Sequence, residues 1–398
     1  MTFLSRSFGS AMIITGTSVG AGMLAIPATV AACGFWISCL LLVIVWFVMY
    51  LSALLLVEVN LSMKSGSNFT SMAVHTLGKS TKILTWISYL MLLYSLTAAY
   101  TSGGAGLIRS GFYFFGVEVN ATFSNIIFIM IFGSVVYIGT FVVDQANKIL
   151  MLVKFISFFS FLFVILPHIQ SSLINFKSKG MSHIWVTFPI LLTSFSYHHI
   201  IPSLRVYTNS DKMQLRRAIL VGSLIPLVVY ILWVMSTLGS IPVVGATSFQ
   251  SIIHSGDITS GIVESYNSPI IGQFAYLFET VSVTTSFLGV TLGLYHFNLD
   301  TYSLSKNSAK SKIFGFIITF LPPLIYLMVY PKGFIIALGY ASFFCAFLLI
   351  ILPSLMAWSL RTRLGINNLK SKGFLILMFS IGLLIIIIEI LSLLHILP

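Results

Sequence analysis

Long apolar stretches, separated by short polar segments, run through the whole of this chain. A helix needs about 20 apolar residues to cross the hydrocarbon core of a bilayer, and eleven stretches are long enough. They cover residues 8–31, 35–60, 83–107, 123–143, 148–168, 184–204, 215–240, 270–299, 313–330, 333–358 and 373–396. The pattern predicts an all-α integral membrane protein with eleven transmembrane helices in a single transmembrane domain, residues 1–398.

Basic residues are distributed unevenly between the two sides that these spans define. With the N-terminus placed in the cytoplasm, seventeen Lys and Arg residues fall on the cytoplasmic side and four on the other. These four are Arg109, Lys177, Lys179 and Lys332. Because cytoplasmic loops collect Lys and Arg, the split predicts that the N-terminus is cytoplasmic and the C-terminus lies on the opposite side. No cleavable signal peptide is expected, so the first span stays in the membrane.

Composition also indicates that lipid surrounds most of the protein. Hydrophobic residues make up 58% of the chain and charged residues 8%, and the mean hydropathy is +1.03. A soluble chain carries roughly 25% charged residues, so lipid must face most of this surface. The excess of Lys and Arg is then explained by membrane topology rather than by nucleic acid binding. Cys33, Cys39 and Cys345 lie in or beside apolar runs and are interpreted as small hydrophobic residues without a disulfide.

Two of the spans are interrupted half-way by helix-breaking or small polar residues. The first reads TGTSVGAGMLAIP over residues 15–27, and the second reads TSFSYHHIIPSL over residues 193–204. In hydrocarbon every backbone amide needs a partner, so a broken helix survives only where it lines a cavity or packs on protein. Glycine is also a common packing residue between membrane helices. A break in each half of the chain nevertheless favours a transport site at the membrane midplane over packing alone.

A break in a helix exposes N–H groups on one side and carbonyl groups on the other. The zwitterion of an amino acid needs both, since amides bind its carboxylate and carbonyls bind its ammonium. Gly16, Gly20 and Gly22 leave the backbone open to a ligand, and Pro27 removes a further helical donor. The chain contains no Walker-type phosphate loop, so we expect an ion gradient to drive transport and no cofactor to be required.

Both breaks resemble the signatures of a known family, the hydroxy/aromatic amino acid permeases of the amino acid/polyamine/organocation superfamily. Residues 16–27 (GTSVGAGMLAIP) are similar to its first-helix signature. Residues 194–198 (SFSYH) and 201–204 (IPSL) are similar to its sixth-helix signature. The resemblance continues into the seventh span with RAI at 217–219, GS at 222–223 and IPL at 225–227. Within the family the chain looks most like the bacterial tyrosine- and tryptophan-specific permeases.

This resemblance implies a LeuT-like fold of two five-helix inverted repeats, residues 8–168 and 184–358, followed by an extra helix over 373–396. It also implies proton symport of an aromatic amino acid, tyrosine or tryptophan or both, into the cell by alternating access, across a bacterial inner membrane with the C-terminus periplasmic. Ser196 and His199 depart from the family, since members often have Gly at both positions. The second break is therefore expected to be bulkier than usual.

Candidate substrate-binding residues lie at the two breaks and on the third span. They are Thr17, Gly20, Ala21, Gly22, Met23, Tyr94, Phe195, Ser196, Tyr197 and His198. An aromatic ligand needs an apolar, ring-lined pocket with one polar end, which Phe195, Tyr197 and Tyr94 are candidates to supply. His198 is a candidate to bond substrate or to carry a proton, and a structural role is equally open. His198 and His199 are adjacent and cannot share a helical face, so no metal site is expected.

Lys154, in the fifth span, is the main candidate for coupling transport to protons. Charge inside a membrane is expensive, so each intramembrane lysine is a functional candidate. The resemblance adds that some proton-coupled proteins of this fold place a fifth-helix lysine where sodium-coupled relatives bind an ion. A lysine that snorkels to the interface is the alternative. Thr284 and Thr285, followed by Ser286, are candidates to line an ion site, which keeps sodium coupling open, although such hydroxyls often bond their own helix.

Other functions stay open. Carriers of small hydroxy amino acids such as serine or threonine form sister branches of the same family. A channel would also use a glycine-rich polar segment, but the paired breaks favour a carrier. An enzyme needs a catalytic constellation, and the nine acidic residues are scattered mostly through loops, so the protein is not expected to be an enzyme. The expected partners are an amino acid substrate and the lipid bilayer, with no nucleic acid and no obligatory protein partner.

Overall fold

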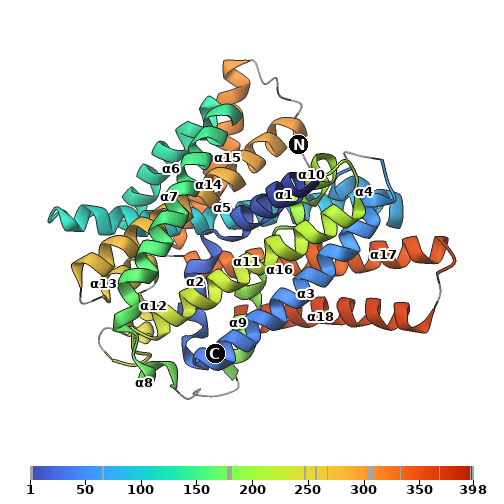
Figure 1. The fold of residues 1–398 in the computed structure, drawn as a ribbon. Coiled ribbons are helices and arrows are strands. Elements are labelled where there is room, and N and C mark those ends of the chain that lie inside the picture. Colours follow the sequence, from blue (N-terminus) through green and yellow to red (C-terminus); the bar gives the residue numbers. More distant parts are fainter. Residues whose placement is uncertain are drawn as a thin grey trace.

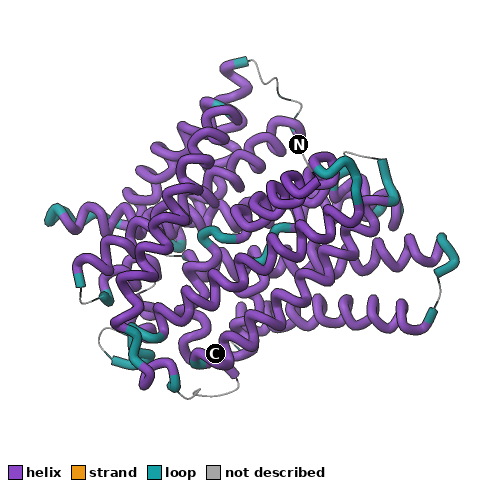
Figure 2. Tube along the Cα trace, viewed as in Figure 1, coloured by secondary structure: helices purple, strands orange, loops and turns teal. Residues whose placement is uncertain are grey.

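The computed structural model describes residues 3–64, 67–176, 182–245, 248–255, 258–266, 268–302, 304, 308–331, 333–366, 368–394 and 396. Throughout these ranges the regular structure is helical, and the described residues contain no strand (Figure 2). Among them, ten helices are long and apolar enough to cross a membrane, and one pair bent at a short break raises the number to eleven. The predicted all-helical membrane architecture is therefore confirmed, with ten to eleven candidate spans.

The spans follow the order that the hydrophobic pattern predicts (Figure 1). The first consists of α1 (Phe3–Ser18), α2 (Gly22–Val30) and a 3-10 turn, η1 (Ala31–Cys33). The sixth consists of α9 (Ser182–Ser194), η3 (His198–Ile200) and α10 (Ile201–Tyr207). The tenth joins α16 (Phe334–Ala346), a π-helical turn η4 (Phe347–Ile351) and α17 (Leu352–Arg363). The others are α3 (Phe35–Leu61), α5 (Thr81–Phe114), α6 (Ala121–Ile138), α7 (Thr140–Ile165), α11 (Lys212–Leu238), α14 (Pro269–Thr301), α15 (Ala309–Val329) and α18 (Leu369–Leu393).

Short helices in the connections were not predicted, because hydropathy over a membrane-length window does not detect them. They are α4 (Phe69–Leu77), α8 (Ser171–Ile174), α12 (Phe249–Ser255) and α13 (Ile258–Glu264), whereas η2 (Leu166–His168) ends the predicted fifth span. The start of α4 nevertheless has a local signal in the sequence, the N-cap residue Asn68. Its side chain accepts a hydrogen bond from the Ser71 N–H at 2.9 Å. Helices α12 and α13 both contact α2, and α13 also contacts α5.

The fifth span begins earlier than its apolar stretch suggests. Helix α7 starts at Thr140, directly after Gly139, whose φ of 136° only glycine adopts readily. Asp144 and Lys148 form an ion pair of 2.6 Å within its exposed first turns. Lys154 consequently lies near the middle of this helix rather than two turns from its start.

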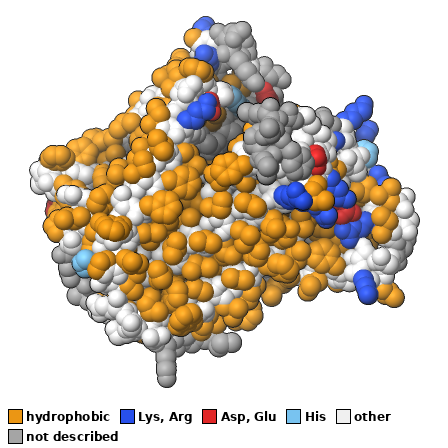
Figure 3. Space-filling view, viewed as in Figure 1, with side chains coloured by type: hydrophobic (Ala, Val, Ile, Leu, Met, Phe, Trp, Pro, Cys, Tyr) orange, Lys and Arg blue, Asp and Glu red, His pale blue; other side chains and the backbone are white. Residues whose placement is uncertain are grey.

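Broken helices occupy the centre of the bundle. All residues of α2 except Thr29 are buried, and α2 packs against α9. Around this pair, α1 packs on α11, α7 on α14 and α16 on α5. The wide middle of the face in Figure 3 is apolar, while Lys and Arg gather at its upper and right-hand rims. Of the four basic residues predicted on the non-cytoplasmic side, Arg109 lies in α5, and Lys177, Lys179 and Lys332 lie outside the described residues.

At three prolines inside spanning helices, the missing backbone hydrogen bond is replaced in the same way. A proline cannot donate to the carbonyl four residues earlier, and in hydrocarbon that carbonyl has no water to replace the donor. In each case a hydroxyl from a neighbouring helix donates to that carbonyl. The pairs are Thr15 to Gly222 before Pro226 (3.1 Å), Tyr94 to Ile318 before Pro322 (2.9 Å), and Ser52 to Leu349 before Pro353. The prolines and the distant hydroxyls therefore fix how these helices register against one another.

Arg205, buried on α10, binds the C-terminal end of a different helix, α3. Its guanidinium donates to the carbonyls of Asn60 and of Met63 (3.0 Å) at the end of α3, and its Nε donates to Ser210 Oγ (3.1 Å). The last carbonyls of a helix lack internal partners and carry the negative end of its dipole. Arg205 therefore caps α3 from the second half of the sixth span.

A second cationic contact ties three helices at the same end of the bundle. Arg361 on α17 binds Glu58 on α3 through two bonds of 2.7 and 2.6 Å, and donates to Ser371 Oγ on α18 at 2.9 Å. The two parallel bonds are the bidentate geometry that suits Arg and a carboxylate. This contact joins the extra C-terminal helix to the bundle.

The pairing of Tyr94 with Pro322 makes a prediction about stability. We expect Tyr94→Phe to lower the free energy of unfolding by about 1 kcal/mol, because it leaves the Ile318 carbonyl without its donor. In the background of Pro322→Ala, which restores a backbone N–H at that position, the same change should cost much less. Thermal unfolding of the four proteins in detergent measures this coupling, and equal losses in both backgrounds would contradict the assignment.

Candidate functional site

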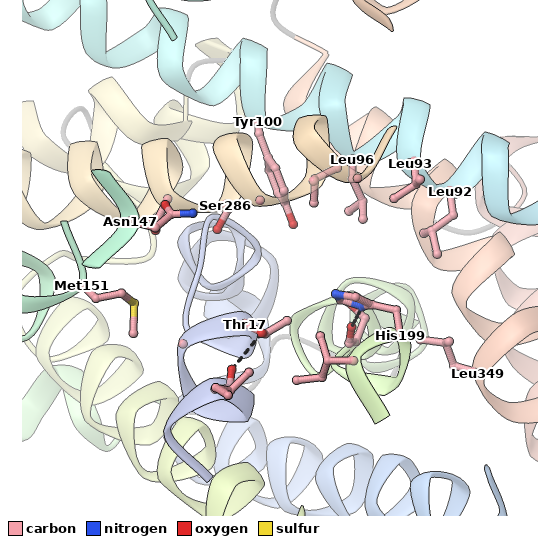
Figure 4. Close-up of a pocket in the computed structure, with 18 of the residues that line it drawn as sticks. Thr17, Leu92, Leu93, Leu96, Tyr100, Asn147, Met151, His199, Ser286 and Leu349 are labelled. Carbon is pink, nitrogen blue, oxygen red and sulfur yellow. Dashed lines mark hydrogen bonds between the residues drawn. The ribbon is translucent and has the colours of Figure 1, made fainter. Parts of the chain in front are cut away.

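A cavity of 690 Å³ lies between α1, α5, α7, α14 and the second break (Figure 4). A neighbouring cavity of 400 Å³ shares the lining residues Phe69, Tyr89, His199 and Gly293 with it, so the two adjoin and outline a path. The path runs past Asp144, Lys148 and α4, toward the end of the bundle where Arg205 and Arg361 lie. The two cavities thereby lead from the breaks in the middle of the spans toward one end of the helix bundle.

One wall of the cavity is apolar and the other is polar. Leucines 92, 93 and 96 of α5 face the cavity together with Ile200, Val290 and Leu348. Thr17, Ser196 and Ser286 supply hydroxyls. Gly289 and Gly293, one turn apart on α14, are exposed, and a Cβ placed on either would meet no atom within 4 Å. The cavity can therefore hold an apolar group with a polar end.

The first break lies at the inner end of this cavity. Helices α1 and α2 are bent by 57° across residues 19–21. Lys154 Nζ, from α7, donates to the Val19 carbonyl at 2.7 Å, and Lys154 is only 1% exposed. The Ala21 N–H donates to Ser286 Oγ, from α14, at 2.9 Å. An ammonium and a hydroxyl from two other helices thus satisfy backbone groups that the break has freed.

Tyr230 of α11 connects the two breaks. Its hydroxyl lies 2.6 Å from the Ser18 carbonyl, at the end of α1, and 2.7 Å from the Ser194 carbonyl, at the end of α9. A phenol carries a single proton, so it donates to one of these acceptors at a time. The second acceptor is left available for a cation or another donor.

Glycines allow the breaks to approach their neighbours. A Cβ on Gly20 would overlap Ser286 Oγ, and a Cβ on Gly22 would lie 3.3 Å from Ser194 Oγ and 3.4 Å from Ser194 Cα. Gly22 therefore lets the first break pack closely against the sixth span. These positions need glycine for space rather than for an unusual φ.

At the second break, side chains of the break itself form hydrogen bonds with its backbone carbonyls. Ser196 Oγ donates to the Thr193 carbonyl at 2.6 Å, and His199 Nδ1 lies 3.1 Å from the Ser196 carbonyl. Phe195 packs edge-on against the Tyr230 ring, with centroids 5.0 Å apart. Tyr197 and His198 stack on each other and are fully buried, away from the cavity.

The predicted substrate residues fall into three groups in the structure. Thr17 and Ser196 line the cavity. Gly20, Ala21, Gly22 and Met23 lie at the first break, just beyond its polar end. Phe195, Tyr197, His198 and Tyr94 are outside the cavity lining, and the Tyr94 hydroxyl is bound to α15.

The residues predicted to couple transport to an ion also occupy different positions relative to the cavity. Lys154 contacts the break and does not snorkel, because its side chain is buried. Thr285 lines the cavity but donates to the Ser282 carbonyl of its own helix at 3.0 Å, and Thr284 is buried outside the lining. Tyr230 was not predicted. Its signal in the sequence was a single hydroxyl in the apolar run that follows Pro226.

The far side of the break is filled by aromatic rings. Phe158 and Phe161 of α7, Trp233 of α11 and Phe278 of α14 are all buried, with neighbouring centroids 5.0 to 5.3 Å apart. These side chains pack three of the helices that surround the breaks. Access from this side is therefore closed in the described structure.

Gly20 gives a prediction about the first break. We expect Gly20→Ala to destabilise the protein by about 1–3 kcal/mol, because the new methyl displaces Ser286 Oγ and leaves the Ala21 amide without a partner. Gly289→Ala is the matched control, since open space surrounds that position and alanine is the better helix former. Thermal unfolding should show a loss for the first variant and none for the second. Equal stabilities would rule out the steric role.

Comparisons with known proteins identify the family to which the chain belongs. The model of the tryptophan/tyrosine permease family matches residues 5–391. The chain is 37% identical to tyrosine-specific transport system 2 of Haemophilus influenzae, over 90% of this chain and 89% of that protein. It is 33% identical to a tryptophan-specific transport protein of Pseudomonas aeruginosa, over 98% and 95% of the two chains. It is also 32% identical to glutamine transporter 2 of Aliivibrio fischeri, over 90% of each. The chain is therefore a multi-pass membrane transporter, not an enzyme, and belongs to the tryptophan/tyrosine permease family.

Proposed function

We propose that this protein is a secondary active transporter that imports tyrosine, tryptophan or both across a bacterial inner membrane by proton symport. The observation that carries the proposal is the cavity, which is lined by leucines and lies beside a break where two carbonyls share a single phenolic donor. The tyrosine- and tryptophan-specific names of its relatives support the same substrate class.

The two ends of an amino acid fit the two ends of this break. The carbonyls of Ser18 and Ser194 share one phenolic proton, so they have capacity for a substrate ammonium. Helix α2 begins at Gly22, and its N-terminal amides and positive dipole end favour a carboxylate. The side chain then lies in the cavity between α5, η3 and α14.

An aromatic side chain suits the size and lining of the cavity better than a small hydroxy amino acid. The cavity has a volume of 690 Å³ and is lined by eight Leu, Ile and Val side chains from five elements, so a serine or threonine side chain would leave it unfilled. The glutamine transporter among the relatives supports a second candidate, a polar neutral amino acid.

Lys154 supports protons rather than sodium as the coupling ion. Its ammonium occupies the position beside the Val19 carbonyl that a bound cation would need. A charged amine buried in a membrane protein is costly, so gain and loss of its proton changes the energy of the break. Sodium remains the alternative, with Thr284 and Thr285 as ligands.

A LeuT-like inverted repeat with alternating access is part of the proposal. Residues 8–168 and 184–358 form the repeats, with 373–396 as the extra helix. It is supported by the two broken spans and by two packed pairs that a repeat exchanges, α7 with α14 and α16 with α5. With the N-terminus cytoplasmic and the C-terminus periplasmic, the cavity faces inward and the aromatic rings close the periplasmic side.

Uptake into proteoliposomes tests the function. We expect labelled tyrosine to accumulate under an inward proton gradient, and unlabelled tryptophan to compete strongly while serine and glutamine compete weakly. A sodium gradient at clamped pH should drive no accumulation. Competition by glutamine or serine alone, or accumulation that depends on sodium alone, would contradict the corresponding part of the proposal.

Lys154 gives the prediction on coupling. We expect Lys154→Met to abolish accumulation under a proton gradient while retaining some exchange of internal for external tyrosine, because exchange needs no net proton movement. Lys82→Met, at an exposed lysine at the start of α5 outside both cavity linings, is the control and should keep the proton dependence. An unchanged proton dependence in Lys154→Met would remove this residue from the mechanism.

A further inference from the structure

His199 differs in exposure from the residues around it. Tyr197 and His198 are fully buried, yet the His199 side chain is exposed in the middle of a membrane span. The exposure arises because His199 lines both parts of the cavity. Figure 4 shows its ring on the second break, on the opposite side of the open space from Leu96 and Tyr100.

The hydrogen bond of His199 to its own turn determines which ring nitrogen can serve a ligand. Nδ1 lies 3.1 Å from the Ser196 carbonyl, which can only accept, so Nδ1 carries the proton of the neutral ring. Nε2 is then an acceptor. Among the residues that the structure describes, no donor is within hydrogen-bond distance of Nε2.

Apolar side chains line much of the larger part of the cavity around His199, while polar residues such as Ser203 and His296 line the smaller part. Ile200 follows His199 in the lining, and Leu92, Leu96 and Leu348 lie in the facing walls. An acceptor that a ligand desolvates without supplying a donor loses its bond to water and gains none. A ligand whose ring carries a donor avoids that loss.

We propose that His199 selects aromatic amino acids whose ring bears a hydrogen-bond donor. Its Nε2 accepts from the phenolic hydroxyl of tyrosine or the indole N–H of tryptophan, and it discriminates against phenylalanine. The inference rests on the proposed function, because it assigns the ring end of the same substrate. His199 is a specificity residue here, and the break itself binds the zwitterion.

Substrates that differ in the donor alone test the assignment. In proteoliposomes above neutral pH, we expect kcat/KM for uptake to be about tenfold higher for tyrosine than for phenylalanine or O-methyltyrosine. The same difference should separate tryptophan from 1-methyltryptophan. His199→Leu should bring each ratio close to one, chiefly by raising uptake of the donor-free compounds relative to the natural ones. His199→Gln, which keeps a side-chain acceptor, should retain part of each ratio.

His168→Leu is the matched control. His168 places its Nδ1 3.2 Å from the Val164 carbonyl of its own helix, in the same manner as His199, but lies exposed outside the cavity. This variant should keep the wild-type ratios. If His199→Leu fails to fold, the ratios are read from His199→Gln and from the thermal shift that each compound gives the wild-type protein.

The outcomes separate the two proposals. Uptake of none of these aromatic compounds by the wild type would overturn the proposed function. Uptake of tyrosine with wild-type ratios near one, or ratios that His199→Leu and His199→Gln both leave unchanged, would overturn the role of His199 while the function stands.

Discussion

Backbone groups that lose their helical partner inside hydrocarbon are the constraint on which this structure depends. Water cannot satisfy them there, so each must meet a side chain, another backbone or a ligand. Lys154, Ser286 and Tyr230 meet this need at the first break, from three different helices. The proposed transport site is therefore built from the donors and acceptors that keep a broken helix stable. Residues proposed to bind substrate and residues that support the fold are close neighbours for this reason.

The same constraint explains how much could be predicted from the sequence. The spans and both breaks follow from hydropathy, glycine and proline, because these depend on local composition. The partner of a freed carbonyl does not, since it comes from residues far away in the chain. Tyr94 illustrates the difference: its hydroxyl is bound to the carbonyl that Pro322 leaves without a donor, 224 positions further along. Tyr230 was missed for the same reason, whereas Lys154 stood out as a candidate because charge is rare in a span.

The two sides of the break differ in how they exclude water. Toward α4 the cavity is bordered by Gly289 and Gly293, where side chains are absent. On the other side Phe158, Trp233 and Phe278 fill the space between α7, α11 and α14. Movement between these helices would have to separate rings that contribute packing energy in addition to buried area. Opening of the closed side is thus opposed by these aromatic contacts.

Arg205 has a consequence for how the sixth span can move. It lies after the break, on α10, yet its hydrogen bonds end α3. A rotation of α10 away from α3 would strip a buried cation of its carbonyl partners. Both halves of the sixth span are therefore held to the second span, α9 by packing and α10 by Arg205, and a movement of α10 would carry the end of α3 with it.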